Sequence, residues 1–73
     1  MNQDIENQPA FVQRMIKEQD DLNNKINKCV DFINGKNFDD LNKKQKHLLK
    51  KQLNIMQEYF NILDKRINLE ALI

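Results

Sequence analysis

The chain has 73 residues, a formal net charge of +1 and a single cysteine, which together exclude several classes of protein. No disulfide can form within it, and one cysteine with one histidine does not supply the ligands of a structural metal site, so we expect no metal or other cofactor. A net charge near zero argues against a protein that binds DNA or RNA polymers, because such proteins show a basic footprint.

The first residues and the hydropathy pattern predict a protein of the cytoplasm. The segment MNQDIENQPA lacks the basic stretch and apolar run of a signal peptide. No segment approaches the roughly 20 apolar residues of a membrane span. We therefore expect no membrane partner.

Residues 1–8 are polar, and we expect them to be flexible. The first helix is predicted from about Pro9 to Ile33, because proline is well tolerated in the first helical turn. Its apolar residues form two adjacent rows at helical spacing: Met15, Leu22 and Cys29, and Val12, Ile26 and Ile33. Gln19 interrupts these rows. It either forms a buried polar pair or lies at the edge of the rows, and we favour the edge.

The connection between the helices begins at Gly35, the only glycine. We expect Gly35 to adopt the left-handed conformation that often ends helices. Residues 36–41 carry Phe38 and Leu41, which we expect to fold back over the open end of a hairpin. Asn42 is then the predicted N-cap of the second helix.

The second helix is predicted over residues 42–72 and has two apolar stripes. The inner stripe comprises Leu49, Leu53, Met56, Phe60, Leu63 and Ile67, and the outer stripe comprises Leu48, Ile55, Tyr59, Ile62, Leu69 and Ile73. One partner helix cannot cover both stripes. We therefore predict an all-α, single-domain antiparallel hairpin over residues 1–73 that assembles into a homo-oligomer. Self-association also supplies stability, since a core of this size alone gives only about 3–5 kcal/mol.

Catalysis is poorly supported. The chain contains no serine or threonine, and His47 lies among lysines. Cys29 falls on an apolar row, where a thiol is inert unless its surroundings lower its pKa. We predict a protein that is not an enzyme.

Phe11 and Lys25 belong to one heptad row that borders the apolar face of the first helix. They lie roughly 21 Å apart along the helix, too far for one copy to bring both to a small ligand. Two antiparallel copies would bring the Phe11 end of one to the Lys25 region of the other. Such a pair suits a ligand with a stackable base and a phosphate. The alternative is that Phe11 is a packing residue and Lys25 is solvated.

Arg66 lies in line with the outer stripe. An arginine on an assembly face needs a partner, because an unpaired buried charge is costly. That partner is an acidic residue of a neighbouring chain (Asp64, Glu70 or Glu58) or the phosphate or base of a ligand.

The combined pattern extends over residues 11–67. It comprises F-x-x-R-M at Phe11 to Met15, Glu18, Leu22, Lys25-Ile26, Phe32-Ile33, Phe38-x-x-Leu41, Leu48-Leu49-x-x-Gln52, Met56-x-x-Tyr59 and Leu63-x-x-Arg66-Ile67. It resembles the small phage-encoded helical-hairpin proteins that act as anti-CBASS cyclic-nucleotide sponges.

The resemblance implies a homohexamer in the host bacterium's cytoplasm that binds cyclic dinucleotides such as 3′,3′-cGAMP between protomers. Some members of this family also hold cyclic trinucleotides at separate sites. By sequestering the signal, such proteins keep the CBASS effector inactive. The resemblance implies Phe11 as the base-stacking residue and Lys25 as the phosphate contact, with Asn27 and Lys28 as polar neighbours. It also implies Arg66 at the second kind of site. Where the family can have a tyrosine, this chain has Phe11 beside Ala10, so a hydroxyl contact is lost.

Two other hypotheses stay open at this point. The outer stripe is also typical of an adaptor that docks on another protein. Five clustered lysines, Lys43, Lys44, Lys46, Lys50 and Lys51, would suit a small nucleic-acid-binding regulator, whose affinity falls steeply with salt.

Overall fold

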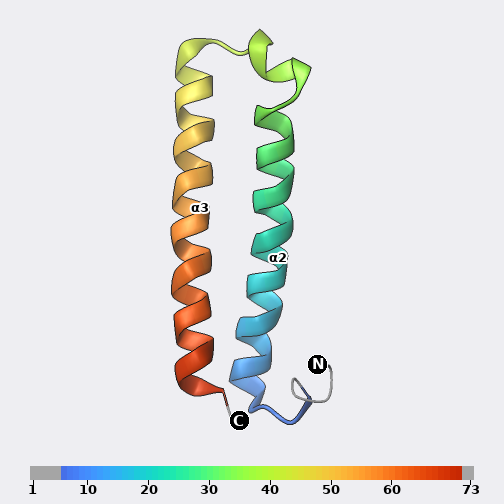
Figure 1. Cartoon of the computed structure of the whole chain (residues 1–73), viewed down its shortest axis with the longest axis vertical. Coiled ribbons are helices and arrows are strands. Elements are labelled where there is room, and N and C mark those ends of the chain that lie inside the picture. Colours follow the sequence, from blue (N-terminus) through green and yellow to red (C-terminus); the bar gives the residue numbers. More distant parts are fainter. Residues whose placement is uncertain (1–5, 72–73) are drawn as a thin grey trace.

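A computed structural model describes residues 6–71 as two long antiparallel helices joined at one end (Figure 1). Helix α2 spans Ala10–Ile33 and helix α3 spans Lys43–Glu70, with a short 3-10 helix, η1, at Lys36–Asp40 between them. The resulting rod measures 47 × 18 × 14 Å. Its described residues contain no strand, and the predicted all-α hairpin is confirmed. None of the helices in residues 6–71 combines the length and apolar character needed to cross a membrane.

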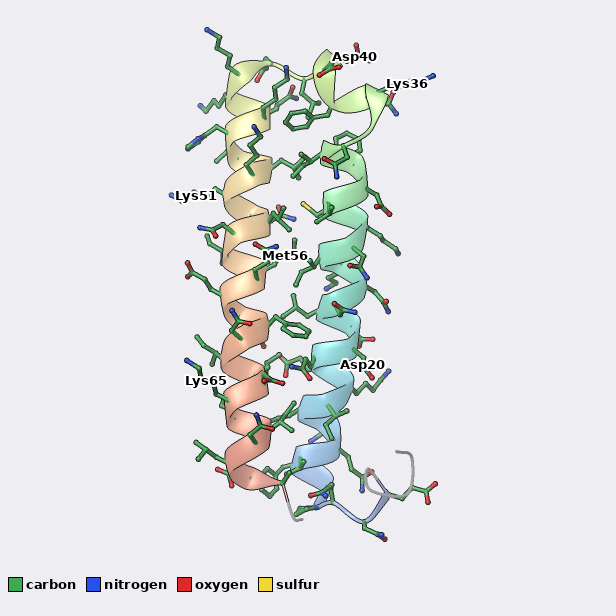
Figure 2. The ribbon with its side chains drawn as sticks, viewed as in Figure 1. Asp20, Lys36, Asp40, Lys51, Met56 and Lys65 are labelled. Carbon is green, nitrogen blue, oxygen red and sulfur yellow. The ribbon has the colours of Figure 1, made fainter. Side chains whose placement is uncertain are left out.

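The core lies between the facing sides of the two helices. Leu63 of α3 is fully buried against Leu22 and Ile26 of α2. Met56, on the same side of α3, points toward α2 in Figure 2. The half-buried residues packed around this centre are Val30, Leu53, Met56 and Phe60. The inner stripe therefore faces α2, as its spacing predicts.

The outer stripe of α3 is not covered by α2. Leu48, Ile55 and Ile62 are 54–55% exposed and Leu69 is 84% exposed. Ile73, the last residue of the predicted stripe, lies outside the described residues. A single hairpin thus leaves a row of large apolar side chains in contact with water.

The prediction for Gly35 is wrong, because its backbone is extended, with φ −92° and ψ 175°. Helix α2 ends instead at Asn34, which keeps a right-handed helical conformation, and η1 completes the reversal of the chain. Glycine still suits this position because a side chain would have little room there. A Cβ on Gly35 would lie 3.2 Å from the carbonyl oxygen of Asp31, a tight contact with the end of α2.

The start of α3 is fixed by a reciprocal cap, in which Asn42 is the N-cap as predicted. The Gln45 backbone N–H donates to the Asn42 side-chain oxygen at 2.8 Å, and the Asn42 N–H donates to the Gln45 side-chain oxygen at 2.9 Å. This capping box satisfies two amides that the helix itself cannot bond. Asn42 was predicted from the sequence as the cap, whereas its partner Gln45 was not.

Phe38 is buried and closes the end of the hairpin, as predicted, while Leu41 is half-buried. The ammonium groups of Lys46 and Lys50 lie 5.4 and 5.5 Å from the centre of the Phe38 ring. Both distances allow cation–π attraction. This end of α3 therefore uses two of its lysines to cover the aromatic ring.

Gln19 lies at the edge of the core, the position that we favoured. It is half-buried, and its side-chain amide donates to the Asp64 carboxylate at 3.3 Å in an exposed setting. Residues 1–5, most of the segment expected to be flexible, lie outside the described residues. The Gln13 side chain donates to the carbonyl oxygen of Gln8 at 2.8 Å, which holds the chain just before α2.

Candidate ligand-binding site

A hollow of about 350 Å³ lies along the border between α2 and α3 and includes the predicted phosphate contact, Lys25. We call it the Lys25 hollow. Its α2 side is built from residues three or four positions apart, which places them on one flank of the helix. Tyr59 of α3 forms the other side. The lining residues are Arg14, Lys17, Glu18, Asp21, Leu22, Lys25 and Tyr59.

The charges of the hollow are mixed, with a surplus of cations. Lys17 and Asp21 form an exposed ion pair at 3.9 Å, which partly neutralises both. Arg14, Glu18 and Lys25 remain without an ion pair in the described part of the chain. An anion can therefore contact the guanidinium of Arg14 or the ammonium of Lys25 without first breaking an ion pair. A guanidinium also binds phosphate in a bidentate manner.

Phe11 lies just beyond one end of this hollow. It is 45% exposed, although a ring of this size normally gains stability from burial. Arg14, the first lining residue, follows it by three positions, about 4.5 Å along the helix axis. The structure thus leaves Phe11 available for stacking and keeps it on the same flank as the hollow, while Lys25 lies at the far end.

Asn27 and Lys28 do not line the hollow, and both are exposed. Asn27 follows Lys25 by two positions, which is about 200° around the helix. One protomer therefore cannot present both side chains to the same small ligand. Lys28 lies closer to the flank of Lys25, because three positions bring the helix nearly one full turn around.

Arg66 is exposed on α3, outside the Lys25 hollow. Within the described residues it forms no ion pair. Both hypotheses for Arg66 need a group from outside this chain, either an acidic residue of a second copy or a ligand. Among the predicted site residues, only Lys25 belongs to the hollow.

Six of the seven lining residues were not among the predicted site residues, and Arg14 and Tyr59 are the two of these that best suit a nucleotide ligand. Arg14 and Lys25 are separated by 11 positions, or about three helical turns, and so share a flank. That spacing is visible in the sequence. Tyr59 is 40% exposed and was assigned to the outer stripe, whereas the structure places it at the border between that stripe and the hollow. This position depends on how the two helices are rotated against each other, which no single-helix pattern gives.

The arrangement offers groups that suit an anionic, planar ligand. Two cations that form no ion pair within the described residues, Arg14 and Lys25, suit phosphate contacts, and Tyr59 and the nearby Phe11 offer stacking surfaces. The hollow contains no cysteine or histidine. Cys29 is buried in the core, with its S–H directed at the carbonyl oxygen of Leu49 at 3.9 Å.

Comparison with known proteins identifies the chain's family. The model of the family described as Sequestin matches residues 9–69, which include α2, η1 and nearly all of α3. No curated protein and no solved structure matches the chain. The family name indicates a sequestering role, in agreement with the resemblance to sponge proteins, and it suggests a binding protein rather than an enzyme. The chain belongs to the Sequestin family.

Proposed function

We propose that this protein sequesters cyclic dinucleotides, such as 3′,3′-cGAMP, and thereby keeps a CBASS-type antiphage effector from being activated. The observation that carries this proposal is the flank of α2, where an exposed phenylalanine, Phe11, precedes a hollow that contains Arg14 and Lys25. A nucleotide ligand requires stacking and phosphate contacts, and this flank offers groups for both. Membership of a family named for sequestration supports the same conclusion.

The site is completed by two copies of the chain. The roughly 21 Å between Phe11 and Lys25 along α2 prevents one copy from using both on one small ligand. In an antiparallel pair of α2 helices, Phe11 of one copy lies level with the partner's Lys25. The same alignment sets Arg14 level with the partner's Leu22, next to the partner's Asp21, and sets Glu18 level with the partner's Glu18 at the two-fold axis. Two equivalent sites result, as two-fold symmetry requires.

The complete assembly in this proposal is a homohexamer in the cytoplasm of a bacterial host. Arg66 contributes to a further site of the second kind, which takes cyclic trinucleotides, while Asn27 and Lys28 are the polar neighbours of Lys25. Asn27 lies on the side of α2 away from Lys25, so any contact it makes belongs to a different site or to a different protomer.

Isothermal titration with 3′,3′-cGAMP tests the proposal. We expect saturable binding, with one dinucleotide at each site formed by Phe11 of one copy and Lys25 of its partner. Lys25→Ala should weaken it at least ten-fold, because a phosphate would lose a charge-assisted contact. Lys36→Ala is the matched control, since Lys36 is an exposed lysine in η1, away from this flank. Absence of heat with every cyclic di- and trinucleotide tried would contradict the proposal.

The exposed outer stripe of α3 supports a second candidate, an adaptor that docks on another protein. Light scattering separates the two. An adaptor remains a single copy until its partner is added, whereas the sponge is an oligomer by itself.

A further inference from the structure

The outer stripe of α3 has the spacing of a coiled-coil face. Leu48, Ile55, Ile62 and Leu69 recur every seven residues, and a second row with the same spacing contains Gln52, Tyr59 and Arg66. Side chains in two such rows pack into the holes between residues of a facing helix. Because α2 covers only the inner stripe, this face is free to receive another helix.

A second hollow, of about 450 Å³, lies on this face and has the composition of such a hole. It is lined by Leu48, Lys51, Gln52, Ile55 and Met56. The first four are the residues that surround a knob inserted from an antiparallel helix. We call it the Leu48 hollow. Leu69, near the other end of α3, is the most exposed large apolar side chain of the described chain, at 84%.

We propose that a second copy of this chain packs its α3 antiparallel to α3, so that Leu69 of each copy enters the Leu48 hollow of the other. The inference deepens the proposed function, on whose oligomer it rests, by identifying the surface and the alignment that join two copies. Each α3 carries both the Leu48 hollow and Leu69. An antiparallel pair therefore makes the same contact twice, as two-fold symmetry requires.

The charges beside the outer stripe support this alignment. When Leu69 faces the partner's Gln52, at the centre of the hollow, Tyr59 faces the partner's Ile62. Glu58 then lies beside the partner's Lys65, and two-fold symmetry makes this pair twice. Glu58 and Lys65 are both exposed, and neither has an ion pair within residues 6–71. Lys65 points away from α2 in Figure 2, as does Lys51.

Other alignments of the same two helices are less favourable. A shift of one heptad in one direction sets Glu58 beside the partner's Glu58, and in the other direction Lys65 beside the partner's Lys65. Like charges at these flanking positions disfavour a pairing. A shift of two heptads pairs Lys51 with the partner's Glu58 but sets Leu69 beyond the start of the partner's α3 and Ile62 at its first turn. A parallel pair sets Lys51 and Glu58 beside the partner's apolar residues Met56 and Leu63.

This contact involves α3, whereas the pairing around Phe11 and Lys25 involves α2, and Tyr59 lies at the border between the two surfaces. Two distinct two-fold contacts on one chain alternate around a closed ring and so produce an assembly with an even number of copies.

Charge reversal tests the alignment. Sedimentation velocity of the unliganded protein should show that Glu58→Lys and Lys65→Glu each lower the mass of the assembly to that of a smaller species, because each places like charges together. The double variant E58K/K65E should restore the original mass. Asp20→Lys and Lys36→Glu are controls of the same charge change at exposed positions away from α3, and they should leave the mass unchanged. Circular dichroism checks that each variant keeps its helices.

Disulfide trapping provides a second test that does not depend on charge. In a Cys29→Ala background, the pair E58C/K65C should oxidise to a covalent dimer. The pair N54C/N61C has the same spacing on an exposed side of α3 and should not. An unchanged mass in both single charge variants, failure of the double variant to recover, or equal trapping by both cysteine pairs would overturn the α3 contact.

These results are independent of ligand binding. The assembly could lose mass in both single charge variants and regain it in the double variant, while the protein binds no cyclic nucleotide. That result would overturn the proposed function and support this contact. A protein that binds 3′,3′-cGAMP but whose assembly keeps its mass in both single charge variants would overturn this contact alone.

Discussion

The two helices of the hairpin differ in how much of their apolar surface the chain itself can bury. Helix α2 buries five side chains, Val12, Met15, Leu22, Ile26 and Cys29, whereas α3 buries only Leu63. The outer stripe of α3 is more than half exposed at Leu48, Ile55, Ile62 and Leu69. A hairpin alone therefore buries most of the large apolar side chains of α2, apart from Phe11 and Phe32, but few of those of α3. We propose that the exposed apolar surface of α3 forms the contacts between copies and that the polar flank of α2 contacts the ligand.

The largest difference is expected between alanine substitutions of a leucine in the inner stripe and a leucine in the outer stripe of α3. Leu63→Ala removes a fully buried side chain and should lower the free energy of unfolding by about 2–5 kcal/mol. Leu69→Ala should leave the helix content unchanged and reduce the mass of the assembly. Urea unfolding and light scattering, both at one fixed protomer concentration, measure these effects. Equal loss of stability in both variants without loss of mass would contradict the distinction between the two stripes.

The cap of α3 should have the next largest effect. Asn42→Ala removes the acceptor for the Gln45 amide and should cost about 1 kcal/mol in the free energy of unfolding. Asn37→Ala, at an exposed position in η1, is the matched control and should change stability by less than about 0.5 kcal/mol. Chemical denaturation of both variants compares them directly. No difference between them would show that the capping box does not stabilise α3.

The smallest effect is expected at Gly35. Its φ of −92° is accessible to any L-residue, so Gly35→Ala should lose no more than about 1 kcal/mol, from the tight contact with the Asp31 carbonyl oxygen. A synthetic chain with D-alanine at this position should be less stable than the one with L-alanine. Thermal unfolding measures both. The opposite order would indicate the left-handed conformation that the sequence pattern suggested.

Much of this fold was predictable because each helix carries its own signal. The spacing of the inner stripe, Pro9 before α2 and Asn42 before α3 depend only on nearby residues. The Gly35 prediction failed because glycine after a helix has more than one use. Here the close approach to Asp31 explains it without a positive φ.

The site was less predictable than the fold. Lys25 was found from its heptad row, and Arg14 was visible on the same flank of α2. The place of Tyr59 beside them depends on how α2 and α3 are rotated against each other, which is fixed by packing between helices and not by either helix alone. The contacts of Asn27, Lys28 and Arg66 depend on neighbouring copies and stay predictions.

The central claim is that the outer stripe of α3 requires another copy of the chain, and the mass of the unliganded protein in solution tests it most directly. Sedimentation equilibrium over a wide concentration range should show an assembly with an even number of copies, and six is the number that we propose. A fully helical protein that stays a single copy at the highest concentration would contradict both the shared ligand site and the α3 contact.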